Sequence, residues 1–137
     1  MHQSNTASLL KRLILKAKIP VIFSRFAQDM FSHDDKYIFG QAGIKGSKYC
    51  RHIMNSCDLV LSLGCRLAPQ FVGLNFEAFD KAEIIMVDID KAEIDKLGDS
   101  VDYSINSDVK LFLEEINNKS SDINFPSWDN WINYCDD

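Results

Sequence analysis

The sequence has little of what several specialised protein classes need. Its 137 residues include only three histidines and four cysteines. The cysteines form no Cys-x-x-Cys pair, and none lies at zinc-ligand spacing from a histidine, which excludes a structural zinc site of the usual kind. We expect the four thiols to be free and buried, as in a chain kept in a reducing cytoplasm.

Clusters of positive charge and long apolar runs are also missing. The net charge is −5 and lysines and arginines are scattered, so no basic face is available to neutralise nucleic-acid phosphates. No apolar run approaches the ~20 residues that span a bilayer. The first residues, Met1 to Thr6, are polar, so no signal peptide is expected and the predicted location is cytoplasmic.

The remaining composition is that of one globular domain, with 46% hydrophobic and 26% charged residues. Helical periodicity and short apolar runs alternate along the chain. Helices are predicted at 6–17, 47–56 and 109–117 and a short one after Asp90, strands at 21–23, 58–64, 83–88 and 101–105, a loop at 24–46 and a last short helix at 126–134. Ser47, Asp90 and Asp108 are predicted helix N-caps.

This alternation predicts an α/β fold. Because the strands are continuous apolar runs, we expect a parallel sheet covered by helices on both faces. Right-handed crossovers then give a three-layer, doubly wound, Rossmann-like sheet. Ligands of such sheets bind beyond the carboxyl ends of the strands, which directs attention to the loops after Phe23, Leu63 and Val87.

Three features at these ends suggest a nucleotide-type site. Gly64 would let a ligand approach the backbone, and Arg66 can pair with a phosphate. Asp88 ends a strand, where a carboxylate often accepts a ribose hydroxyl. The glycines at 40–46 could form a loop over a ring or a phosphate. Each feature also has a structural interpretation, as a turn, a surface ion pair or a helix cap.

Five segments in this order carry a resemblance to a known family. They are Ile-Pro-Val-Ile (19–22), the glycine loop 37–46, the aspartate-to-arginine segment 56–66, the segment 79–94 ending in Asp-Ile-Asp and a short helix, and the closing segment 105–113. Together they resemble the central domain of thiamine-diphosphate-dependent enzymes, most closely the acetolactate synthases. The resemblance covers roughly the central three-quarters of the chain.

The resemblance implies a non-catalytic Rossmann-like spacer of a homo-oligomeric carboligase or decarboxylase that acts on 2-keto acids. In this family the pyrimidine-binding and diphosphate-binding domains hold thiamine diphosphate and magnesium, and neither domain is recognisable in this sequence. The spacer of some members binds FAD, ADP or a coenzyme A moiety. By position, the resemblance assigns cofactor-binding roles to Gly43, Lys45, Gly46, Gly64, Arg66, Asp88, Ile89 and Asp108.

The sequence also departs from the family. The Phe-Asp-Asp-Arg usual after the glycine-x-arginine is replaced by Leu67-Ala68-Pro69-Gln70, and Ile44-Lys45 replaces a Met-His pair. These changes remove polar groups that would hold FAD and favour a different substrate range. The family's central domain opens with a strand and a glycine-rich turn, whereas this chain begins in the first helix.

These observations predict a central domain over 1–119, lacking the family's first strand, and a connector with a short helix over 120–137. Two alternatives remain open. One is an interaction or scaffold module that keeps the fold without a cofactor. The other is an NAD-binding protein of related fold, which would need a catalytic histidine in a strand-end loop. No catalytic residue or metal ligand is predicted within this chain.

Overall fold

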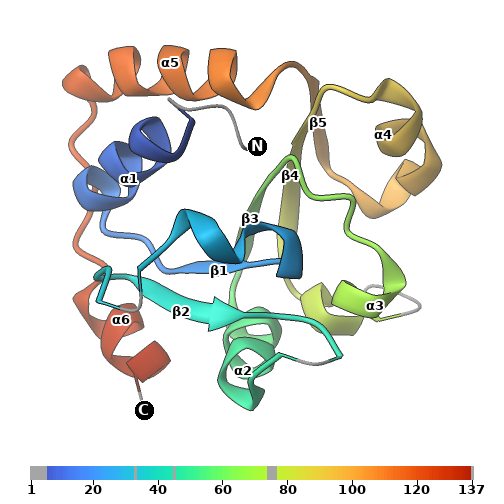
Figure 1. The fold of residues 1–137 in the computed structure, drawn as a ribbon, viewed down its shortest axis with the longest axis horizontal. Helices are drawn as coiled ribbons and strands as arrows, with labels where there is room; N and C mark the ends of the chain where they lie inside the picture. Colours follow the sequence, from blue (N-terminus) through green and yellow to red (C-terminus); the bar gives the residue numbers. More distant parts are fainter. Residues whose placement is uncertain (1–5, 33, 45, 74–76, 137) are drawn as a thin grey trace.

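Helices and parallel strands alternate along the chain (Figure 1) in the computed structural model, which describes residues 6–32, 34–44, 46–73 and 77–136. The α-helices are α1 (Thr6–Ala17), α2 (Lys48–Ser56), α3 (Pro69–Val72), α4 (Lys91–Leu97), α5 (Val109–Lys119) and α6 (Asp129–Asp136). The strands are β1 (Val21–Phe23), β2 (Ile38–Gln41), β3 (Leu59–Leu63), β4 (Glu83–Asp88) and β5 (Tyr103–Asn106). Short 3-10 helices occupy Arg25–Met30, Glu77–Phe79, Gly98–Ser100 and Ser120–Asp122.

The three predicted helix N-caps are confirmed. The Ser47 hydroxyl accepts the amide of Cys50 at 3.2 Å, the Asp90 carboxylate that of Ala92 at 3.0 Å, and the Asp108 carboxylate that of Lys110 at 2.7 Å. Each cap satisfies an amide that has no partner inside its own helix, which fixes where α2, α4 and α5 begin.

Among the described residues, all strand pairings are parallel, and they form two sheets. One sheet contains β1 and β2, and the other contains β3, β4 and β5 in that order. The predicted α/β class with a parallel, Rossmann-like arrangement is therefore confirmed. The sheet is divided between β1 and β3, which do not pair.

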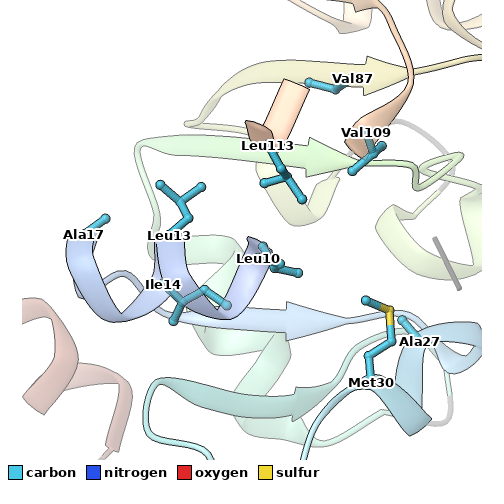
Figure 2. Packing of buried hydrophobic residues seen from close by; sticks show 9 residues of the cluster. All are labelled: Leu10, Leu13, Ile14, Ala17, Ala27, Met30, Val87, Val109 and Leu113. Atoms are coloured by element: carbon cyan, nitrogen blue, oxygen red, sulfur yellow. The ribbon is translucent and has the colours of Figure 1, made fainter. Parts of the chain in front are cut away.

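Both sheets nevertheless share the same helix layers. The first core packs α1 and α5 over one face of the strands (Figure 2), and it consists of Leu10, Leu13, Ile14, Ala17, Ala27, Met30, Val87, Val109 and Leu113. Side chains of β1 (Val21 and Phe23) and of β3 (Leu61 and Leu63) pack against this core. One face of each sheet therefore packs against the same two helices, α1 and α5.

The opposite faces meet in a second core. It is formed by Ala42, Cys50, Met54, Leu67, Val72, Ala78, Phe79 and Ile84, and Ile22 of β1 and Val60 of β3 pack against it. Because alternate residues of each strand reach opposite cores, the two sheets act as halves of one layer between α1/α5 and α2/α3.

The prediction of a loop over 24–46 is wrong at two places. A 3-10 helix covers Arg25–Met30, and β2 covers Ile38–Gln41. The strand is hard to recognise because it contains Gly40, whose φ is 118°, and follows Tyr37, whose φ is 74°. Its four residues are all only half-buried, so no strong apolar alternation marks it.

The carboxyl-terminal helix α6 packs against α2. The Tyr134 ring lies 4.9 Å from the His52 ring and 5.3 Å from the Trp131 ring, measured between centroids. The Tyr134 hydroxyl and the Ser56 hydroxyl are 2.9 Å apart and share a hydrogen bond. These aromatic contacts hold residues 129–136 against the domain.

All four cysteines are free thiols, and Cys50 and Cys135 are buried. Burial raises the pKa of Cys50, Cys57 and Cys65, and it raises the pKa of Cys135 to about 11. A raised pKa keeps a thiol protonated at neutral pH, and a protonated thiol is a poor nucleophile.

The buried side chain of Leu113 provides a test of the first core. Leu113 is fully buried, whereas Leu111 on the same helix is 61% exposed. We expect Leu113→Ala to lower the free energy of unfolding by about 2–5 kcal/mol because it leaves a cavity. Leu111→Ala, the matched control, should change it by less than about 0.5 kcal/mol. Urea denaturation of both variants measures the difference, and equal losses would contradict this core.

Thiol alkylation tests the protonation state of the cysteines. With a pKa of about 11, the thiolate population of Cys135 at pH 8 should be on the order of 100-fold below that of a thiol with the ordinary value of 9.0. Iodoacetamide should therefore modify Cys135 slowly in the folded chain and all four cysteines rapidly in guanidinium. Peptide mass mapping over time follows each site. Rapid modification of Cys135 in the folded chain would refute the assignment.

Candidate nucleotide site at the strand ends

The carboxyl ends of β3, β4 and β5 lie side by side. Leu63 is in register with Val87, and Asp88 is in register with Asn106. Backbone hydrogen bonds continue past the strands, from the Gly64 amide to the Val87 carbonyl at 2.8 Å and from the Ser107 amide to the Asp88 carbonyl at 3.0 Å. The structure therefore brings together Gly64, Asp88 and the start of α5, as expected for a parallel sheet.

The turn after β3 positions Arg66. Gly64 has a φ of 58°, in the left-handed region where glycine carries no steric penalty. The buried Ser62 hydroxyl donates to the Cys65 carbonyl at 3.3 Å and fixes the turn from within. Arg66 then points outward: its Nε lies 3.9 Å from the Glu93 carboxylate, and its side chain is 72% exposed. Such a long, exposed ion pair holds the guanidinium weakly and leaves its donors available.

The turn after β4 is held by hydrogen bonds from two directions. The buried Asp88 carboxylate accepts the amide of Asp90 at 2.9 Å. From β5, the Asn106 side-chain amide donates to the carbonyls of Asp88 and Ile89, both at 3.0 Å. The Ile89 side chain is 70% exposed beyond this turn. Asp88 therefore has a structural role, although only one of its two oxygens is used by this bond.

Asp108 likewise has a structural role, because its carboxylate accepts a backbone hydrogen bond. Its Oδ1 caps α5, so its position at the edge of the site follows from where the helix begins. The negative charge also interacts favourably with the positive end of the helix dipole. Of the predicted site residues, Asp88 and Asp108 thus fix the conformation of the loops at the strand ends through hydrogen bonds to the backbone.

The glycine loop after β2 reaches the segment that follows Arg66. The Ile44 amide donates to the Gln70 carbonyl at 3.1 Å, and a Cβ on Gly43 would lie 3.2 Å from the same oxygen. A Cβ on Gly46 would lie 2.4 Å from the Gln41 carbonyl, which no side chain tolerates. These glycines permit close backbone contacts, and Lys45 lies outside the described residues.

A pocket of about 180 Å³ lies next to Arg66. It is lined by Arg66, Leu67, Ala68, Pro69, Glu93, Lys96 and Leu97. Its wall combines apolar side chains with two cationic groups, Arg66 and Lys96, and one anionic group, Glu93. Burial and the nearby Asp88 charge also raise the pKa of Cys65 at the edge of this region, which argues against a thiolate nucleophile there. A larger pocket of about 300 Å³ lies away from the strand ends, between 16–18 and 123–127.

Three residues of this region are not identified by the sequence analysis. Asn106 fixes the Asp88 turn, and Glu93 and Lys96 reach the pocket from α4. The position of Asn106 at a strand end is a signal that could have identified it. Glu93 and Lys96 carry no such signal, because their role depends on how α4 packs beside the turn after β3.

The described residues offer neither a metal-binding cluster nor a membrane-spanning helix. Among them, histidine, cysteine, aspartate and glutamate side chains form no group of three or more that could hold a metal ion. Nor does any helix in this part of the chain have the length and apolar character needed to cross a membrane.

Comparison with known proteins identifies the family. The family model described as the thiamine pyrophosphate enzyme central domain matches residues 1–116. The acetolactate synthase large subunit of Pyropia yezoensis is 32% identical over 136 residues, covering 95% of this chain and 23% of that protein. Acetolactate synthase 1, chloroplastic, of Zea mays is 36% identical over 109 residues, covering 79% of this chain and 17% of that protein.

The acetolactate synthase large subunit of Porphyra purpurea is 33% identical over 93 residues, which is 68% of this chain and 16% of that protein. The chain thus spans about a fifth or less of the length of two of these relatives and 23% of the third. The family model covers most of the chain, and the folded elements have the α/β arrangement that the resemblance implies. The chain therefore belongs to the family of thiamine pyrophosphate enzyme central domains.

Proposed function

We propose that this chain is the spacer domain of a longer thiamine-diphosphate-dependent carboligase or decarboxylase that acts on 2-keto acids. The observation that supports this most directly is the match of residues 1–116 to the family, with relatives named acetolactate synthase. Thiamine diphosphate and magnesium would be held by the pyrimidine-binding and diphosphate-binding domains of such an enzyme. The domain itself then supplies structure and a nucleotide site rather than a reacting group.

The nucleotide that best suits the strand ends is a nucleoside diphosphate such as ADP. Arg66 and Lys96 line the same pocket and offer two positive charges to a diphosphate, against the one negative charge of Glu93. Asp88 retains an acceptor oxygen for a ribose hydroxyl, because the Asp90 amide uses the other. Gly43, Gly46, Gly64, Ile89 and Asp108 form the surrounding backbone, and Lys45 is assigned to the site by the resemblance alone.

FAD fits these residues poorly. Pockets that enclose a ligand of drug size have volumes of roughly 300–1,000 Å³. The pocket beside Arg66 measures about 180 Å³, so it could hold the diphosphate of ADP but would enclose neither a whole ADP nor the larger FAD. The segment at 67–70 also presents an apolar wall of Leu67, Ala68 and Pro69 where a polar one would be needed to hold a flavin. ADP is therefore the better candidate ligand than FAD.

Calorimetric titration with ADP tests the site. We expect saturable binding to the full chain and a loss of about tenfold or more in affinity for Arg66→Ala, because one charge-assisted interaction contributes roughly 1.5–3 kcal/mol. Arg51→Ala is the matched control, since Arg51 is an exposed arginine on α2, and it should bind ADP as the unmodified chain does. FAD should bind more weakly than ADP. If ADP does not bind at all, the domain is a scaffold without a cofactor.

Titration with thiamine diphosphate and magnesium tests the spacer role. The chain should show no saturable binding, because the groups that hold this cofactor belong to other domains in the family. Tryptophan fluorescence can follow the titration, since Trp131 stacks on Tyr134 at the surface of α2. A dissociation constant in the micromolar range or below would overturn the assignment as a spacer.

A further inference from the structure

The wall of the pocket beside Arg66 contains an acidic side chain, although the ligand proposed for this pocket is an anion. Glu93 of α4 lines the pocket together with Arg66 and Lys96. Figure 1 shows α4 on the same side of the molecule as the segment that connects β3 to α3, and both contribute to the pocket wall. A carboxylate at this place repels a diphosphate, because like charges brought together in a binding site oppose association.

Glu93 occupies the third position of α4, where a glutamate commonly folds back to cap its own helix. In such a capping box the glutamate accepts the backbone amide of the N-cap residue, which is Asp90 in this helix. That amide instead donates to the Asp88 carboxylate at 2.9 Å, and the Asp90 carboxylate accepts the Ala92 amide at 3.0 Å. The cap of α4 is therefore complete without Glu93, and its carboxylate can face the pocket.

The other carboxylates of residues 88–95 are held more tightly than that of Glu93. Two of them accept the backbone amides just described, and the third, Asp95, accepts two hydrogen bonds from the Lys91 ammonium group, at 2.6 and 2.7 Å. Within the part of the chain that the structure describes, Glu93 forms its ion pair with Arg66, and the two atoms are 3.9 Å apart, which exceeds the length of a hydrogen bond. The partner of Glu93 is therefore the easiest of these to exchange.

The two members of this ion pair differ in exposure. The Glu93 side chain is 19% exposed and the Arg66 side chain is 72% exposed. The glutamate is thus the fixed member, held in the pocket wall, and the arginine is the mobile one. The contact is made by the Nε atom of Arg66, so it does not use the terminal amino groups of the guanidinium. These groups can bind a phosphate while Arg66 moves away from Glu93.

Lys96 places a second positive charge close to the first. It follows Glu93 by three residues on α4, a spacing that puts both side chains on one side of the helix, and both line the pocket. A diphosphate that pairs with Arg66 and Lys96 must therefore come near the Glu93 carboxylate. Binding exchanges the carboxylate contact of Arg66 for a phosphate contact, and the repulsion by Glu93 lowers the net gain.

We propose that Glu93 is a built-in competitor of the ligand phosphate, which pairs with Arg66 when no phosphate is bound and so lowers the affinity of the pocket for phosphate ligands. This inference rests on the proposed nucleotide site and adds to it the residue that sets the affinity. In this role Glu93 acts through Arg66 and through its own negative charge, and it makes no favourable contact with the ligand.

Titration of the full chain with inorganic pyrophosphate tests the competitor role. Pyrophosphate presents the charge of a diphosphate without a nucleoside, and NMR can follow its binding through the Nε–Hε signal of Arg66. Glu93→Gln removes the negative charge and keeps the size of the side chain. We expect this variant to bind pyrophosphate about fivefold or more tightly than the unmodified chain, because the repulsion and the competing partner are both removed.

Asp95→Asn is the matched control. It removes the same charge from the same helix, but Asp95 is paired with Lys91 and does not line the pocket. Its affinity for pyrophosphate should stay within about twofold of that of the unmodified chain, because an exposed charge outside the pocket is screened by solvent. In an Arg66→Ala background the gain from Glu93→Gln should shrink, since the competitor then has no arginine to hold, and this coupling distinguishes competition from a general loss of charge.

Equal gains in Glu93→Gln and Asp95→Asn would show that only the net charge of the chain matters, and this result would overturn the proposal. Equal affinities of Glu93→Gln and the unmodified chain, or binding of pyrophosphate to neither, would overturn it as well. Titration with ADP separates this inference from the proposed function. If pyrophosphate behaves as expected and ADP does not bind, the nucleotide assignment fails and the competitor role stands. If ADP binds and Glu93→Gln leaves both affinities unchanged, the competitor role fails and the nucleotide assignment stands.

Discussion

The contact of α1 and α5 across the strands is the interaction on which the rest of the structure depends. The two sheets do not pair with each other, so hydrogen bonds between strands do not hold them together. They are joined by the first core, where Leu13 of α1 and Leu113 of α5 pack with Val87 of β4. The buried Asn117 adds a polar link, because its amide donates to the Leu9 carbonyl of α1 at 3.0 Å. A two-stranded sheet such as β1–β2 has little stability of its own and depends on this packing.

The geometry of the candidate site also depends on this packing of the two sheets against α1 and α5. Its glycine loop belongs to one sheet, while the turns that carry Arg66 and Asp88 belong to the other. The two parts meet where the Ile44 amide donates to the Gln70 carbonyl. Packing that aligns the sheets thus also places the glycine loop beside the cationic pocket. Asp88 and Asp108 also lie at the site as a consequence of the fold, because their carboxylates fix the loops through backbone hydrogen bonds.

Local features of the sequence were sufficient to predict most elements. The bounds of α1, the start of α5 and the whole of β4 follow from caps and apolar periodicity, which are encoded within a few residues, whereas α5 ends two residues later than predicted, at Lys119. The strand β2 was missed because Gly40 and the positive φ of Tyr37 conceal a short, half-buried strand. The division of the sheet could not be predicted, since no local pattern specifies which strand edges pair. For the same reason Arg66 and Asp88 can be identified from their places at strand ends, whereas Lys96 cannot, because its position depends on packing between elements.

The free edge of β3 and the candidate site share one strand. The Gly64 amide donates to the Val87 carbonyl of β4, so the backbone groups of the preceding residue, Leu63, face the edge of β3 away from β4. The turn at Gly64 also sets the direction of Arg66. The turn itself is held by the hydrogen bond from the Ser62 hydroxyl to the Cys65 carbonyl, and Ser62 belongs to the same strand. The division of the sheet and the candidate site are therefore adjacent features of one strand, β3.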